Sequence, residues 1–122
     1  MHDEKSFYVR SFRFALDILK LNKALRSRRE LAPHITKQLI RAGTSIGANL
    51  EEARSAYSRR DLASKQTIAL REARECHFWL RLIVAEEPKL EPSIYPLLEE
   101  CSQLVAMLTA SVKTLRQKRD EH

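Results

Sequence analysis

The stretch REARECHF, residues 71–78, brings together carboxylates, a thiol and an imidazole, the groups that build metal centres and nucleophilic sites. In a helix, Glu75 and His77 point to different sides, whereas di-iron bundles use Glu and His three positions apart. Cys76 and His77 are adjacent and diverge by about 100° around a helix, which is unfavourable for a nucleophile and its base. We therefore expect no catalytic residue, no metal site and no cofactor, and we place His77 at a boundary or surface position.

Both glycines of the chain, Gly43 and Gly47, lie one helical turn apart in LIRAGTSIGANLEEA. A phosphate-binding loop would need a lysine and a preceding strand, and this stretch has neither. Apolar residues continue through the glycines at steps of three and four, so the helix is not expected to break. Because each glycine costs a helix about 1 kcal/mol relative to alanine, we interpret the pair as a strip for close helix packing. We expect the small residues Ala69, Ala73 and Cys76 to face it.

Helical periodicity extends over most of the 122 residues, and no segment shows the alternation of a β-strand. Pro33 suits a first helical position, and Ser58 with Asp61 forms an acidic variant of the capping box. We predict helices over residues 5–30, 33–57, 59–86 and 93–118. Short connections favour a single all-α domain over residues 1–122, an up-down-up-down antiparallel four-helix bundle.

The first predicted helix is apolar on more than one side. Its expected seam comprises Tyr8, Phe12, Ala15, Leu19 and Leu25, widened by Phe14, Leu16, Ile18 and Leu21. The seam of the second helix extends as far as Tyr57. A helix as broadly apolar as the first contacts several neighbours or a partner subunit. We therefore expect a homo-oligomer.

The net charge of +6 is distributed unevenly along the chain. Residues 1–31 and 32–60 carry +4 and +3, whereas 61–88 and 89–122 carry −1 and 0. A basic surface can follow phosphates without distinguishing sequence. The alternative is an ordinary charged bundle surface whose long side chains cover apolar flanks. The candidate nucleic-acid-binding residues are Arg10, Arg13, Lys20, Lys23, Arg26, Arg28, Arg29, Arg41, Arg59 and Arg60.

A second set of polar residues lies in the stretches NLEEARSAYSRRD and LREARE. One interpretation is solvated helix faces with weak pairs one turn apart. The other is pairing across helices or subunits, between Glu51 or Glu52 and Arg71 or Arg74. Asn49 belongs to the same set of candidates.

The two cysteines, Cys76 and Cys101, have no metal-ligand spacing, and we expect buried thiols in a reducing compartment. The first residues lack the pattern of a signal peptide. No apolar run approaches the roughly 20 residues that span a bilayer. We expect a cytoplasmic protein with no membrane association and no small-molecule substrate.

Residues 38–83 resemble the signature region of the bacterial four helix bundle protein family, first noted as reading frames in intervening sequences of 23S rRNA genes. The resemblance lies in RAGTSIGAN at 41–49, the Glu51–Glu52–Ala53 run, and IALREARE at 68–75 with Trp79–Leu80. It implies an antiparallel four-helix protomer in a ring-like homopentamer. The family is similar to the accessory variability proteins of diversity-generating retroelements, which are basic pentamers that bind nucleic acid and a reverse transcriptase. Five chains of +6 would carry about +30, although the near-neutral second half departs from that strongly basic pattern.

Two functions are consistent with these features. The first is a non-enzymatic homo-oligomeric bundle that binds RNA or DNA through its basic first half, as an accessory to a ribonucleoprotein. The alternative is a structural or protein-interaction module that docks a protein partner without binding nucleic acid. We expect no enzymatic activity in either case.

Overall fold

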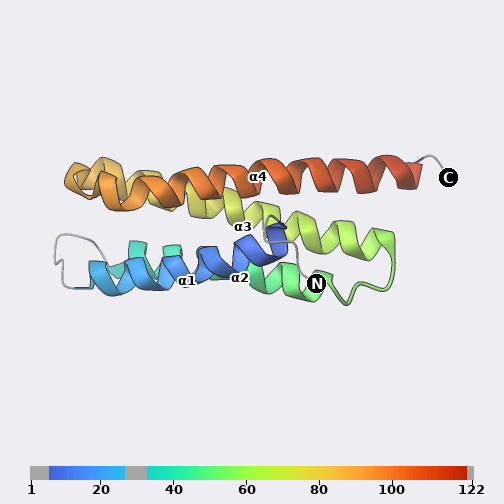
Figure 1. Cartoon of the computed structure of the whole chain (residues 1–122), viewed down its shortest axis with the longest axis horizontal. Coiled ribbons are helices and arrows are strands. Elements are labelled where there is room, and N and C mark those ends of the chain that lie inside the picture. Colours follow the sequence, from blue (N-terminus) through green and yellow to red (C-terminus); the bar gives the residue numbers. More distant parts are fainter. Residues whose placement is uncertain (1–5, 27–32, 121–122) are drawn as a thin grey trace.

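Four helices follow one another in the computed structural model, which describes residues 6–26 and 33–120. They are α1 (Phe7–Leu25), α2 (Pro33–Ala53), α3 (Arg59–Glu86) and α4 (Glu91–Asp120), with a short 3₁₀ helix, η1 (Pro88–Leu90), before α4. Each α-helix contacts the next, and α1 also contacts α4, whereas α1 and α3 lie across a diagonal. Figure 1 shows α1 and α2 in one layer and α3 and α4 in the other, with neighbours antiparallel. The predicted four-helix bundle is confirmed.

The helix starts follow local capping chemistry. Ser6 Oγ accepts a hydrogen bond of 3.0 Å from the Tyr8 backbone N–H at the start of α1. Ser58 Oγ accepts one of 3.0 Å from the Asp61 N–H at the start of α3, which confirms the predicted cap. These bonds satisfy amides that have no partner within their helix.

The second helix is shorter than predicted. It ends at Ala53 rather than at residue 57, because the chain must become extended at Ser58, whose φ and ψ are −156° and 164°. Tyr57, which the periodicity placed on the apolar seam, is 89% exposed instead. At the first helix, the predicted residues 27–30 lie outside the described ranges. The last helix begins at Glu91, two residues earlier than predicted.

The face of α1 that enters the core differs from the predicted seam. Phe14 and Ile18, expected only to widen that seam, are fully buried. Phe12 is 72% exposed, and Leu16 and Leu19 are also exposed. The prediction was right for Leu25, which is buried, and wrong for Phe12 and Leu19, because α1 carries apolar residues around most of its circumference and its own pattern does not select an inner face.

The two glycines of α2 do mark a close helix contact, but with α1. A Cβ at Gly43 would lie 2.8 Å from Ile18 Cγ1, and one at Gly47 would lie 3.3 Å from the Ser11 carbonyl oxygen. The expectation that Ala69, Ala73 and Cys76 face them was therefore wrong.

That small-residue stripe of α3 is buried and approaches α4 instead. Cys101 Sγ on α4 donates a hydrogen bond of 3.1 Å to the Ala73 carbonyl. Cys76 and Cys101 are both buried free thiols, as predicted. Hydrogen bonding with Cys101 and burial raise the pKa of the Cys76 thiol, so it stays protonated. Small side chains thus allow close approach at both helix pairs.

Candidate nucleic-acid interface

Arg10, one of the predicted phosphate-binding residues, is part of the bundle framework. Its Nε donates to Glu100 Oε2 on α4 at 2.8 Å, and its Nη2 donates to Gln103 Oε1 at 2.5 Å. The hydrogen bond with Glu100 raises the pKa of the Arg10 guanidinium further above its usual value. This side chain joins α1 to α4 and is 20% exposed, so it offers little to an external ligand.

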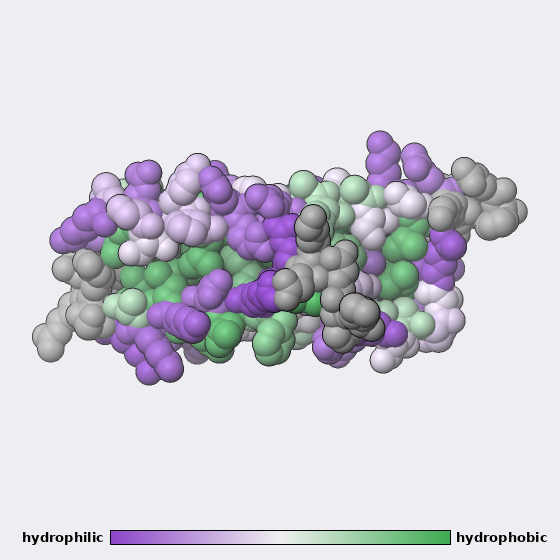
Figure 2. Space-filling view, in the orientation of Figure 1, coloured by the Kyte–Doolittle hydropathy of each residue, from purple (hydrophilic) through white to green (hydrophobic). Residues whose placement is uncertain are grey.

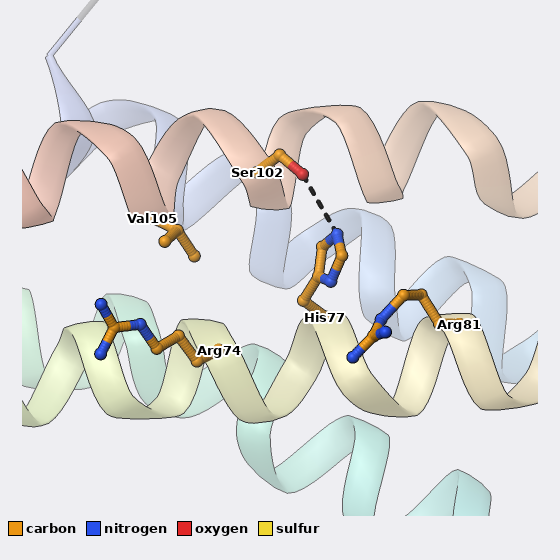
Figure 3. Close-up of a pocket in the computed structure, with 5 residues that line it drawn as sticks. All are labelled: Arg74, His77, Arg81, Ser102 and Val105. Carbon is orange, nitrogen blue, oxygen red and sulfur yellow. Dashed lines mark hydrogen bonds between the residues drawn. The ribbon is translucent and has the colours of Figure 1, made fainter.

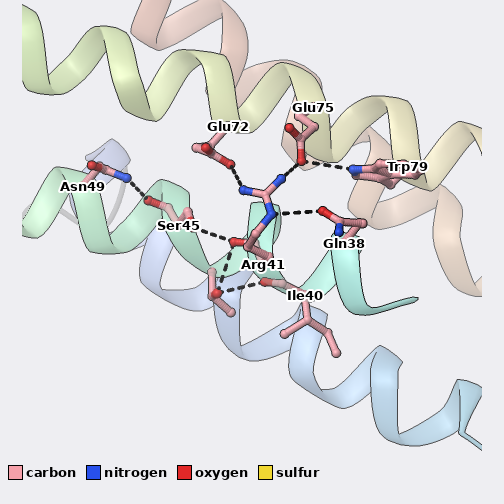
Figure 4. A network of polar contacts seen from close by, with 9 residues as sticks. Gln38, Ile40, Arg41, Ser45, Asn49, Glu72, Glu75 and Trp79 are labelled. Atoms are coloured by element: carbon pink, nitrogen blue, oxygen red, sulfur yellow. Dashed lines mark hydrogen bonds and ion pairs between the residues drawn. The ribbon is translucent and has the colours of Figure 1, made fainter. Parts of the chain in front are cut away.

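Arg41 has a similar role between α2 and α3 (Figure 4). Its Nη1 pairs with Glu72 Oε2 at 3.0 Å, and its Nη2 pairs with Glu75. Its Nε donates to Gln38 Oε1 at 3.1 Å, and Trp79 Nε1 donates to Glu75 Oε2 at 3.1 Å. Two carboxylates of α3 thus share one cation from α2.

The cross-helix pairing predicted from Glu51 or Glu52 to Arg71 or Arg74 is not what the described residues show. Glu51 pairs with Arg54, three residues further on, at 3.2 Å. Asn49, the other candidate, donates from Nδ2 to the Ser45 carbonyl at 2.8 Å within α2. A different ion pair joins α2 to α3, in which the cation, Arg41, comes from α2 and the carboxylates, Glu72 and Glu75, from α3.

The remaining predicted cations fall into two separate groups. Arg13, Lys20, Lys23 and Arg26 are exposed on α1 or at its end. Arg59 and Arg60 are exposed in the first turn of α3, in the other layer. Arg28 and Arg29 lie outside the described residues. The structure therefore does not gather the eight candidates that it describes into one surface.

A cationic groove lies between α3 and α4, where the net charge of the sequence gave no reason to expect it. It comprises two adjoining hollows, of about 300 and 440 Å³, which share Arg74. We define this α3–α4 groove by its polar lining residues: Thr67, Arg74, His77, Arg81, Ser102, Thr109, Lys113 and Arg116. Among the side chains that the structure describes, no Asp or Glu lines either hollow.

Hydroxyl groups hold the side chains of the groove in place (Figure 3). His77 Nε2 lies 3.1 Å from Ser102 Oγ across the two helices. Burial and the nearby Arg81 lower the pKa of His77, which favours the neutral imidazole. In the second hollow, Arg116 Nη2 donates to Thr67 Oγ1 at 3.1 Å. No ion pair joins Arg74 or Arg81 to a carboxylate among the described residues.

The groove exists because the arginines and the glutamates of α3 lie on different sides of the helix. Arg60, Thr67, Arg74 and Arg81 recur every seven residues, a spacing that places them along one stripe of the helix. The carboxylates of Glu72 and Glu75 lie toward α2, where Arg41 meets them. The sequence prediction missed His77, Arg81, Lys113 and Arg116. It relied on the net charge of whole segments, in which positive and negative residues cancel. The seven-residue spacing of the arginines was the signal that could have revealed the stripe.

This arrangement suits phosphate groups. Guanidinium groups donate bidentate hydrogen bonds to phosphate, and the hydroxyls add further donors. From Thr67 to Arg81 the groove extends over about 21 Å at 1.5 Å per residue, more than a single phosphate needs. At its Arg81 end the groove adjoins another hollow, which shares His77, Arg81 and Ser102 with it and is also lined by Glu99. A hydrogen bond with Glu99 raises the pKa of the Tyr95 phenol there.

The described residues contain no group of three His, Cys, Asp or Glu side chains placed to hold a metal ion. No helix among them has the length and apolar character needed to cross a bilayer.

Comparisons with known proteins agree with the fold and the signature residues. A family model described as 23S rRNA-intervening sequence protein matches residues 4–110. A crystal structure of a protein of unknown function from the S23 ribosomal protein family of Bacteroides thetaiotaomicron is 33% identical, with a TM-score of 0.82. The match covers 88% of this chain and 99% of that one. No curated protein matches the chain. The chain therefore belongs to the family of 23S rRNA-intervening sequence proteins.

Proposed function

We propose that this protein is a non-enzymatic, homo-oligomeric helical bundle that binds nucleic acid, in particular RNA, as an accessory to a ribonucleoprotein. The α3–α4 groove carries the proposal, because four cationic side chains and, among the described residues, no carboxylate line its two hollows. Contacts to phosphate supply affinity that does not depend on sequence. The family description, which refers to a 23S rRNA intervening sequence, supports RNA as the ligand.

The homo-oligomeric part of the proposal rests on α1. Phe12, Leu16 and Leu19 are exposed along its outer side, and Figure 2 shows apolar surface between hydrophilic side chains on this face of the bundle. A contiguous apolar stripe on a soluble chain indicates a contact with another protein surface. In an oligomer each subunit would contribute its own groove, so a long RNA could engage several at once and gain avidity.

A paired set of variants tests the groove. Arg74→Ala with Arg81→Ala removes two charges from it, whereas Lys20→Ala with Lys23→Ala removes the same charge from α1. Binding of a 23S rRNA fragment is measured by fluorescence anisotropy over a salt series, and light scattering checks the assembly of each variant. We expect the groove variant alone to bind more weakly, with a salt slope reduced by roughly 0.7–0.9 for each lost phosphate contact.

Two results would contradict the proposal. The first is no detectable binding of rRNA fragments or duplex DNA by the wild-type protein at low salt. The second is loss of binding in the α1 variant with full binding in the groove variant. This result would show that the binding site lies on the α1–α2 layer.

A second candidate function is a module that docks a protein partner through α1, and the exposure of Phe12 favours it. It predicts a partner that is retained after nuclease treatment and released by Phe12→Ser. If the partner is lost with nuclease, nucleic acid is the link and the first function is favoured.

A further inference from the structure

A third hollow lies where α2 turns into α3, at the end of the bundle that also holds the last turns of α4 (Figure 1). Its volume is about 490 Å³, within the roughly 300–1,000 Å³ of ligand clefts. Tyr57 stands at this turn with 89% of its surface exposed. Its backbone is nevertheless held, because the Tyr57 N–H donates to Asp61 Oδ2 at 3.4 Å within the α3 cap. An anchored backbone therefore presents an aromatic ring to solvent.

The lining of this hollow combines apolar and cationic groups. Tyr8, Leu62 and Leu115 supply apolar surface, and Arg54 and Arg59 supply charge. The Arg54 guanidinium carbon lies 4.8 Å from the centroid of the Tyr8 ring, a cation–π contact. Among the described residues no carboxylate lines the hollow, although Arg54 is paired with Glu51. A flat ligand that carries negative charge fits this chemistry, whereas a cationic peptide does not.

The hollow and the α3–α4 groove both lie along α3 and α4, but they share no lining residue. Leu115 of the hollow is followed in α4 by Arg116 of the groove, and Arg60 begins the stripe of α3 that leads to Arg74. A nucleic-acid strand whose phosphates follow the groove would reach the α2–α3 turn with its bases beside Tyr57.

We propose that this hollow receives an unpaired nucleobase, which stacks on the ring of Tyr57 while Arg59 and Arg60 contact the adjoining phosphates. The inference rests on the proposed function and specifies its ligand as single-stranded nucleic acid, or an unpaired loop. A base within a duplex has both faces covered by its neighbours, so it cannot stack on an external ring without leaving the helix.

Three probes separate stacking from phosphate attraction: a short oligouridine RNA, an abasic strand of equal length, and an RNA duplex. We expect Tyr57→Ala to weaken oligouridine binding by about 5- to 150-fold, the range for loss of one stacked base. Binding of the abasic strand and the duplex should not change. Tyr57→Phe should keep wild-type affinity, because stacking needs the ring and not the hydroxyl. Tyr95→Ala, at another exposed tyrosine but one beside Glu99, is the matched control and should have no effect.

The possible failures can be distinguished. Oligouridine binding by Tyr57→Ala equal to wild type would overturn the inference and leave the groove proposal intact. An equal loss for all three probes would overturn it too, since the effect would not depend on a base. If the wild-type protein binds none of the probes, the proposed function itself fails.

Discussion

The two layers of the bundle use their cations differently. By net charge the two layers are similar, +3 over α1 and α2 and +2 over α3 and α4. In the α1–α2 layer, Arg10 and Arg41 are paired with carboxylates of the other layer, whereas the α3–α4 layer carries the α3–α4 groove.

The difference shows that folding pairs charges of one layer with charges of the other. Arg10 pairs with Glu100, and Arg41 is shared between Glu72 and Glu75. Three carboxylates of the second half are therefore paired with cations from the first half. Arg74 and Arg81 remain available on the outer side of α3. We expect changes in the first layer to affect stability, and changes in the groove to affect binding.

The largest effect is expected from the helix contact within the first layer. Gly43→Leu would force its side chain into Ile18, and overpacking costs about 1–3 kcal/mol or more in the free energy of unfolding. Urea denaturation measures the loss. Ala110→Leu, at an exposed site on α4, is the control and should be nearly neutral. An unchanged unfolding midpoint for Gly43→Leu would show that α1 does not pack against this glycine.

Charge reversal in the groove should separate binding from stability. Lys113→Glu with Arg116→Glu should weaken RNA binding by about tenfold or more at moderate salt, because phosphate attraction becomes repulsion. The melting temperature should change little, since both side chains are exposed. Lys23→Glu with Lys37→Glu, both exposed on the other layer, is the control with the same change of charge. If this control weakens binding as much as the groove variant, only the total charge of the protein matters and the two layers do not differ in binding.

A smaller effect on stability is expected at the ion pair between the layers. Arg10→Met keeps much of the side-chain volume but removes the partner of Glu100, which should cost about 1 kcal/mol. RNA affinity should stay at the wild-type value. Lys23→Met, an exposed substitution of the same kind on α1, should leave the free energy of unfolding unchanged. A loss of RNA affinity in Arg10→Met without a loss of stability would show that Arg10 contributes to RNA binding after all.

The smallest effect concerns pH. The folded-state pKa of His77 lies below its ordinary value of 6.5, so below that pH the unfolded chain binds more protons. Stability should therefore fall as the pH is lowered through about 6.5, and His77→Gln should lose part of this dependence. The neutral ring faces Arg74 and Arg81 on α3 and lies near Ser102 and Glu99 on α4.

Bound phosphate should oppose that trend, because a nearby anion favours the imidazolium form. RNA affinity at constant salt should then rise on acidification in the wild type and rise less in His77→Gln. Identical pH profiles for the two proteins, in stability and in binding, would show that His77 does not contribute to the RNA-binding site.

The sequence by itself determined the number of helices and their order. Apolar residues at steps of three and four extend through Gly43 and Gly47, and Ser58 with Asp61 marks a helix start through bonds within a few residues. The signature around RAGTSIGAN also pointed to the correct family. These features depend on residues close in sequence, so a linear pattern contains them.

Only the tertiary structure decided which faces meet and which charges remain on the surface. The packing of Ile18 over Gly43 set the inner face of α1 and left Phe12 outside, a choice that the pattern of α1 could not make. The pairing of Arg41 with Glu72 and Glu75 depends on residues about thirty positions apart. Electrostatic energy depends on distance in space, so a sum of charges along the chain could not locate the groove beside Arg74 and Arg81.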